Sequence, residues 1–204
     1  MKAECHTKSP ERAVSPSRVD DDVLLDAARA CVLDQGVRRT TLTDVARRAE
    51  VSRMTLYRRF PDVRSLLTAL MTREFGQLLA RVSGSVTGQN ARARLVGGSV
   101  ASVRAIVADP LMRTVLDRDG ELVLPYVVQR LGSTQHIAEQ FLLAQLAAGH
   151  EDGSVRMADP AAQARALLLV VQSFVLSHGP ATVDVGAEAL LAELAHVLDA
   201  SLAP

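Results

Sequence analysis

Two short apolar-periodic stretches joined by a tight turn constrain the fold of this chain more than any other feature. The first opens at a threonine suited to capping and places apolar residues at helical spacing, namely Leu42, Val45, Ala46 and Ala49. The second opens at Ser52, carries Leu56, and ends near Phe60 and Pro61. A small residue such as Ala46 lets two helices cross closely. The pattern predicts a helix-turn-helix.

Longer helices are predicted on both sides of this unit. The preceding helix is expected to run from about 21 to 35, with acidic residues as its cap and Gly36 as its stop. Asp62 is expected to begin a long helix that leaves the unit and enters the rest of the chain. The sequence therefore predicts three helices that pack together before this long helix continues.

The rest of the chain reads as helices separated by glycine and proline, and no strand alternation persists in it. With 48% apolar residues, the composition favours helices packed on helices. The chain is thus predicted to be all-α, with an N-terminal three-helix helix-turn-helix domain followed by a larger helical domain. The expected divisions are an arm at 1–19, the helix-turn-helix domain at 20–66 and the larger domain at 67–204.

Positive charge is concentrated in the helix-turn-helix segment, although the whole chain is neutral. Lysine plus arginine and aspartate plus glutamate each number 23. Between residues 36 and 64, eight arginines stand against only Asp44, Glu50 and Asp62, whereas acidic residues exceed basic ones from residue 76 onward. A basic segment of this kind is the electrostatic footprint of nucleic-acid binding.

The second short helix is predicted to present a surface rich in hydrogen-bond donors. If Leu56 faces inward, the outward side chains are Arg53, Met54, Thr55, Tyr57 and Arg58. Such a surface suits a major groove and its phosphates. Thr41 and Thr43, at the start of the first short helix, offer hydroxyls and backbone amides to a phosphate.

The segment from Thr41 to Asp62, TLTDVARRAEVSRMTLYRRFPD, resembles the DNA-binding signature of the tetracycline repressor (TetR) family. Its ending, Val-Ser-x-x-Thr-Leu-Tyr-x-x-Phe, is the most recognisable part. The resemblance implies a recognition helix at 52–58, with phosphate or base contacts from Thr55 and Tyr57. Together these arguments give the expected DNA contacts, which are Thr41, Thr43, Ser52, Arg53, Met54, Thr55, Tyr57, Arg58 and Arg64.

Three positions depart from the residues usual in that family. Glu50 stands where most members have glycine in the turn, at a cost of about 1 kcal/mol if its φ is positive. Met54 replaces a common glycine and is able to contact a thymine methyl group. Val63 replaces a lysine that contacts phosphate, so that Arg64 or Arg59 has to supply this contact.

The two C-terminal helices are predicted to serve dimerisation. One is expected to open at Asp159 and Pro160 and run through His178, and the last is expected at about 186–202. Both are apolar on more than one face, which leaves one face for a partner; the alternative is two interior helices of a monomer. Similarity to the family implies a four-helix interface between two copies. The interface residues expected on this basis are Leu168, Val171, Val175, Leu190, Leu194 and Leu198.

A ligand pocket is expected among the middle helices, lined mainly by apolar side chains with a few polar groups. The chain has few aromatic residues, and most of them fall in these helices. Any one of these side chains can instead serve packing or lie at the surface. The candidate ligand contacts are Phe75, Leu79, Arg104, Met112, Tyr126, His136, Phe141, Gln145, Phe174 and His178.

The sequence offers no metal site, cofactor motif or catalytic constellation. The histidines are scattered without metal-binding spacing, and the nucleophile-elbow and phosphate-binding glycine motifs do not occur. Cys5 and Cys31 form no disulfide framework, which favours a reducing cytoplasm. Residues 1–16 lack an apolar signal core, and the apolar run at 166–177 is too short to span a bilayer. We therefore expect a cytoplasmic protein without a membrane partner.

These observations favour a homodimeric repressor that binds double-stranded operator DNA and is released by a small-molecule effector of unknown identity. Two recognition helices would reach successive major grooves of a near-palindromic operator, with the helix that begins at Asp62 as the lever. The alternative is a helical ligand- or protein-binding module that lacks operator specificity, given Glu50 and Val63. A helical enzyme would need a polar constellation that the sequence does not show.

Overall fold

The computed structural model of the chain describes residues 20–123, 125 and 129–204. Within these residues all regular secondary structure is helical, as the sequence predicts. The expected arm at 1–19 and the candidate ligand contact Tyr126 lie outside the described residues. No single described helix is long and apolar enough to cross a membrane, although the helices Ala91–Ala108 and Pro110–Asp119, which meet at a bend of 68°, together have sufficient length and apolar composition.

The N-terminal helices begin and end where the sequence places them. Their bounds are α1 Asp21–Gln35, α2 Leu42–Arg48, α3 Arg53–Arg59 and α4 Val63–Ser85. Each begins at a side-chain cap that accepts a backbone N–H, and the capping residues are Asp20, Thr41, Ser52 and Asp62. Asp62 and Ser65 form a reciprocal capping box. Local hydrogen bonds therefore fix the start of every helix in this region.

Two residues with positive φ form the sharp turns of this region. Gly36 stops α1 with φ 86°, a conformation that glycine adopts without strain. Glu50 occupies the turn between α2 and α3 with φ 56°. Because this φ is positive, the expected backbone strain of about 1 kcal/mol applies to Glu50. The next residue, Val51, donates its backbone N–H to Ala46 O at 3.0 Å, which closes the turn. The helix-turn-helix thus forms with glutamate in place of the usual glycine.

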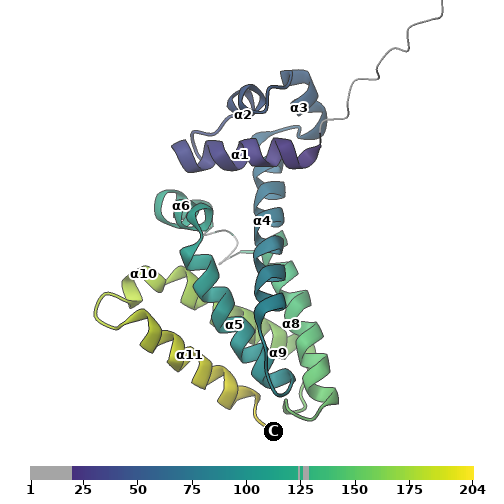
Figure 1. The fold of residues 1–204 in the computed structure, drawn as a ribbon, viewed down its shortest axis with the longest axis vertical. Coiled ribbons are helices and arrows are strands. Elements are labelled where there is room, and N and C mark those ends of the chain that lie inside the picture. Colours follow the sequence, from purple (N-terminus) through teal and green to yellow (C-terminus); the bar gives the residue numbers. More distant parts are fainter. Residues whose placement is uncertain (1–19, 124, 126–128) are drawn as a thin grey trace, which may run out of the picture.

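We call residues 20–70 the head and the remaining described residues the body. Figure 1 shows the head at one end of the molecule, with α4 running from it as a long column into the body. The helices of the body are α5 Ala91–Ala108, α6 Pro110–Asp119, the 3₁₀ helix η1 Gly120–Leu122, α8 Ser133–Glu151, α9 Pro160–Leu176, α10 His178–Ala181 and α11 Ala187–Leu202.

The head has a core of its own, to which the body contributes one side chain. Val45, Leu56 and Leu66 are fully buried where α1, α2, α3 and α4 meet. Leu111, from α6 in the body, is also fully buried in this cluster. On the outside, Arg73 of α4 forms ion pairs with Asp22 and Asp26 of α1 at 3.1 and 2.7 Å, so that α1 and α4 are joined by charge as well as by packing.

The C-terminal helices differ from their predicted form in two respects. The helix that opens at Pro160 ends at Leu176 rather than continuing through His178, because the chain breaks at Ser177 before the short α10. Three of the expected interface residues, Leu168, Leu194 and Leu198, are buried in the core of the body itself. A side chain that the protomer already encloses is not available to a second copy, so we correct this part of the expected interface.

The other expected interface residues lie at intermediate depth. Val171 and Val175 of α9 pack on the body core and also line the cavity described below, whereas Leu190 of α11 is half-buried. The exposed apolar side chains of these two helices are instead Leu169 on α9 and Val197 on α11. The sequence identified the two helices as apolar on several faces, but it did not reveal which face turns inward.

Candidate DNA-binding surface and effector cavity

The exposed face of α3 carries the side chains that the sequence predicts there. Met54 is 77% exposed and Tyr57 49% exposed, whereas Leu56 between them is fully buried. Ser52 caps the helix by accepting the Thr55 backbone N–H at 3.0 Å. Because the inward Leu56 anchors α3 to the head core, the opposite face is held rigidly toward solvent.

The arginines of the head divide into two groups. Six of them have ion pairs or hydrogen bonds to other parts of the protein, namely Arg29, Arg38, Arg39, Arg47, Arg48 and Arg59. The other three, Arg53, Arg58 and Arg64, are exposed and have no such partner among the described residues. These three belong to the predicted DNA contacts. Their charges are thus available for an external anion such as phosphate.

The start of α2 is less free than the sequence suggests. Thr41 Oγ1 accepts the Asp44 backbone N–H at 3.2 Å and donates to Asp44 Oδ2 at 2.6 Å. This hydrogen bond, helped by Arg47, lowers the pKa of the Asp44 carboxyl. Thr41 therefore already uses its one hydroxyl proton inside the protein, whereas Thr43, half-buried, has no hydrogen bond of this kind among the described residues.

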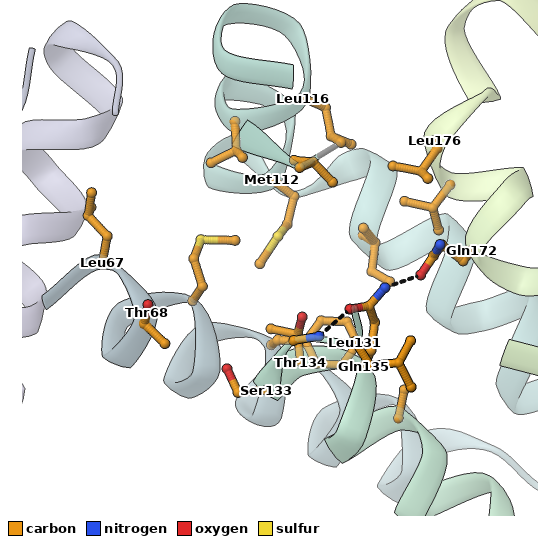
Figure 2. A pocket seen from close by; sticks show the side chains of 18 of the residues that line it. Leu67, Thr68, Met112, Leu116, Leu131, Ser133, Thr134, Gln135, Gln172 and Leu176 are labelled. Carbon is orange, nitrogen blue, oxygen red and sulfur yellow. Dashed lines mark hydrogen bonds between the residues drawn. The ribbon is translucent and has the colours of Figure 1, made fainter. Parts of the chain in front are cut away.

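A cavity of about 1120 Å³ opens between the head and the body. Its walls come from α4, α5, α6, α8 and α9, and Figure 2 shows part of its lining. Most of the lining is aliphatic or aromatic, as expected for a site that binds a small organic molecule. Hydrogen-bonding groups are few, and the labelled Gln135 and Gln172 lie together on one wall.

Four of the predicted ligand contacts line this cavity, and five others do not. The lining includes Phe75, Leu79, Met112 and Phe141. The residues that lie elsewhere are Arg104, His136, Gln145, Phe174 and His178. Arg104 instead pairs with Glu188 at the surface, and His136 Nδ1 lies 2.8 Å from Gly132 O. Phe174 packs against the core of the body.

Sequence reasoning missed the main polar groups of the cavity. Gln135 donates from Nε2 to Gln172 Oε1 at 2.6 Å, and Gln135 Oε1 accepts the backbone N–H of Gly132 at 2.6 Å. Gln172 and Ser173 interrupt the otherwise apolar run at 166–176, and an amide in such a run was a usable signal. Ser99 and Ser102 of α5 also line the cavity and are buried.

The cavity and the head core share two helices. Leu111 of α6 is enclosed in the head core, and the next residue, Met112, lines the cavity. In α4, Leu70 is fully buried in the head core and also lines the cavity. Because α6 and α4 each touch both regions, an occupant of the cavity contacts elements that also hold the head.

A second contact fixes the end of α6 against the head. Asp119 is buried, and its Oδ2 accepts the backbone N–H of Val37 at 2.8 Å. Its other oxygen lies 3.7 Å from Nε of Arg38, which also pairs with Glu121. The chain just after α1 is therefore joined to the chain around η1 by a buried hydrogen bond.

The described residues contain no cluster of three or more histidine, cysteine, aspartate or glutamate side chains placed to bind a metal ion.

Comparison with known proteins identifies the family of the chain. The sequence profile of the bacterial regulatory proteins of the tetR family matches residues 24–70. An uncharacterized HTH-type transcriptional regulator of Mycobacterium tuberculosis is 37% identical over 179 residues, which cover 88% of this chain and 92% of that protein. The regulator AqdR of Rhodococcus erythropolis is 42% identical over 64 residues, 31% of each chain.

Solved structures share the fold at low sequence identity. The R. erythropolis transcriptional repressor QsdR superposes with a TM-score of 0.67 at 17% identity, covering 90% of this chain and 96% of that one. FadR from Bacillus subtilis, solved in complex with stearoyl-CoA, gives 0.65 at 15% identity, covering 90% and 100%. The all-helical fold, the match in the helix-turn-helix and the Mycobacterium relative agree: the chain belongs to the tetR family of bacterial transcriptional regulators.

Proposed function

We propose that the protein is a homodimeric repressor that binds a palindromic operator and is released when a small-molecule effector fills the cavity. The observation that carries the proposal is the placement of Leu111 and Met112, consecutive residues of α6, in the head core and in the cavity wall. An occupant that displaces Met112 also displaces Leu111, and with it the head.

The DNA contacts of this proposal come from α3 and its neighbours. Arg53 and Tyr57 lie on the exposed face of α3, which suits a major groove. The side chains of Arg58 and Arg64 form no ion pair or hydrogen bond with a described residue, and they are placed to neutralise phosphates. In a dimer two such helices would lie roughly 34 Å apart, the length of one turn of DNA.

Dimerisation is proposed to use the outward faces of α9 and α11. Leu169 is 52% exposed and Val197 49% exposed, and the neighbouring outward positions include the small Ala166 and Ala192. Small side chains let helices approach closely, and exposed apolar side chains gain from a cover. We place this dimer in the cytoplasm, where it has access to chromosomal DNA.

Release requires that the effector prefer the conformation that binds DNA poorly. The shift in operator affinity then equals the difference in effector affinity between the two conformations, and operator DNA weakens effector binding by the same factor. The hydrogen bond from Val37 to Asp119 gives a second route by which α6 and η1 act on the head. A regulator of the same fold holds stearoyl-CoA, which supports a ligand site in this architecture.

The proposal is tested by recovering genomic fragments on the purified full-length protein at several salt concentrations. We expect a short inverted repeat that is retained at physiological salt and protected in a footprint. Uniform recovery that disappears as salt rises would contradict the proposal and favour a binding module without operator specificity. If an inverted repeat is found, the genes beside it would suggest candidate effectors. Each candidate would be tested for whether it reduces binding of the protein to that operator.

The base contact proposed for Arg53 is tested by Arg53→Ala, which should relax specificity at particular base pairs by about 1–3 kcal/mol. Arg47→Ala is the matched control, because Arg47 pairs with Asp44 at 2.7 Å and lies outside α3. Its operator profile should keep the same base preferences. An unchanged profile for the Arg53 variant would refute the base contact.

A further inference from the structure

We propose that the effector is an uncharged, elongated aliphatic molecule with a carbonyl group, to which Ser102 and Gln172 donate hydrogen bonds. The inference rests on the cavity being the effector site of the proposed function, and it narrows that effector to one chemical class. It follows from the charge of the walls, the orientation of one amide and the unused hydroxyl of one buried serine.

The inner walls of the cavity carry no charge. The lining residues contributed by α5, α6, α8 and α9 include no aspartate, glutamate, lysine, arginine or histidine. The charged residues of the described lining come from other segments, and they are Arg38, Arg64, Glu121 and Arg130. Arg38 and Glu121 form an ion pair with each other. An ionised group placed against the inner walls would lose its hydration without a counter-charge, which is strongly unfavourable.

The orientation of the Gln172 amide is set by a backbone group. The N–H of Gly132 can only donate, so the atom of Gln135 that it contacts at 2.6 Å is the oxygen Oε1. The other end of the Gln135 amide, Nε2, is then the donor to Gln172, 2.6 Å away, and the accepting atom is Gln172 Oε1. Gln172 therefore directs its NH₂ group away from Gln135, and no described residue accepts a hydrogen bond from it (Figure 2).

Two serines of α5 line the cavity, and they differ in one respect. Ser99 donates its hydroxyl to Leu95 O at 2.8 Å, the usual contact of a serine within a helix. Ser102 is only 7% exposed and its hydroxyl has no hydrogen bond to any described residue. The Ser102 hydroxyl is not among the fully enclosed side-chain atoms that lack a partner, so it is accessible, and the cavity that Ser102 lines is the side from which a partner can come.

The Gln172 amide and the Ser102 hydroxyl favour a ligand that presents an uncharged hydrogen-bond acceptor. The Gln172 NH₂ group can only donate, so the ligand atom that meets it is a hydrogen-bond acceptor, and a carbonyl oxygen also accepts from a serine hydroxyl. Other parts of the lining are formed by apolar side chains such as Ile106 and Leu142 of the inner walls and Leu67 of α4, which suit an aliphatic chain. A volume of about 1120 Å³ exceeds that of most small-molecule sites, so there is room for an extended molecule.

The test measures direct binding to the full-length protein, without DNA, of probes that share one alkyl chain. The probes are methyl laurate, dodecane, laurate, dodecyl phosphate and dodecylammonium, compared by calorimetric titration at neutral pH. We expect methyl laurate to bind about tenfold more tightly than dodecane, since one or two hydrogen bonds are gained. Equal or tighter binding of laurate or dodecyl phosphate would overturn the inference and place a charged head near the arginines. A failure of every probe to bind would also overturn it.

The hydrogen bonds are tested with variants on the same two walls. Ser102→Ala and Gln172→Met should each reduce the advantage of methyl laurate over dodecane several-fold, by roughly the worth of one hydrogen bond. Ser99→Ala is the matched control, because the Ser99 hydroxyl is already used within α5, and it should leave the ratio unchanged. If the two serine variants lose the ratio equally, the assignment to Ser102 is wrong.

Release of the protein from operator DNA is measured in a separate experiment. This separates a failure of the proposed effector mechanism from a failure of the proposed ligand class. Binding of methyl laurate with the expected selectivity, but without loss of operator affinity, would support the ligand class and contradict the effector mechanism. Release by laurate or dodecyl phosphate, with no selectivity for the ester, would support the mechanism and contradict the ligand class.

Discussion

In the head, the helices close over one apolar core, whereas in the body α4, α5, α6, α8 and α9 surround a cavity of about 1120 Å³. The head therefore holds a recognition surface in one fixed shape. The body leaves room for a ligand and for the movement of its helices. Both regions have buried apolar clusters, so the difference lies in the cavity rather than in the kind of contact.

The largest expected effect concerns Leu111, the buried side chain that the body contributes to the head core. Leu111→Ala should destabilise the protein by about 2–5 kcal/mol, because Leu111 is fully buried in the head core. Equilibrium unfolding in urea measures this loss. Met112→Ala is the control and should cost less, because its side chain borders an existing cavity. Equal losses would mean that α6 does not belong to the head core.

A smaller effect is expected at the contact between η1 and the end of α1. Asp119→Ala leaves the Val37 N–H without its acceptor and should cost about 1–3 kcal/mol. The neighbouring Glu121→Ala removes only an exposed ion pair with Arg38 and should change the unfolding free energy little. Thermal unfolding of both variants measures the difference. If both lose the same amount, the buried hydrogen bond does not hold the head against the body.

The smallest effect tests whether the stability of the head is set by local conformation. Glu50→Gly should raise the free energy of unfolding by about 1 kcal/mol, because glycine adopts φ 56° without strain. The adjacent Ala49, with φ −80°, is the control, and Ala49→Gly should destabilise. A loss of stability in the Glu50 variant would show that the glutamate side chain stabilises the turn by another contact.

Features that depend on a residue and its immediate neighbours were predicted correctly from the sequence. Caps and turns are local, so Thr41, Ser52 and Gly36 are recognised from the residue and its neighbours alone. The same reasoning located the start of α9 at Pro160, where a capping aspartate precedes a proline. Within the head, the inward position of Leu56 followed from spacing and is confirmed.

In the body, the same reasoning fails where a prediction depends on how helices face one another. Leu194 and Leu198 are spaced like an interface stripe, but the stripe packs on α5 within the protomer. Phe174 was considered for the cavity because aromatic residues are rare, yet it faces the core. The importance of Gln172 depends on its meeting Gln135 from another helix, and no local pattern reports such a meeting.

Six of the head's arginines have partners within the protein and three do not, and this division affects how DNA binding depends on ionic strength. An arginine that neutralises a DNA phosphate releases condensed counterions, and each such contact contributes about −0.9 to the slope of log K against log salt. An arginine already paired with a carboxylate has its charge compensated before DNA arrives. Three unpaired arginines in each head therefore predict a shallower salt dependence of DNA binding than nine would produce.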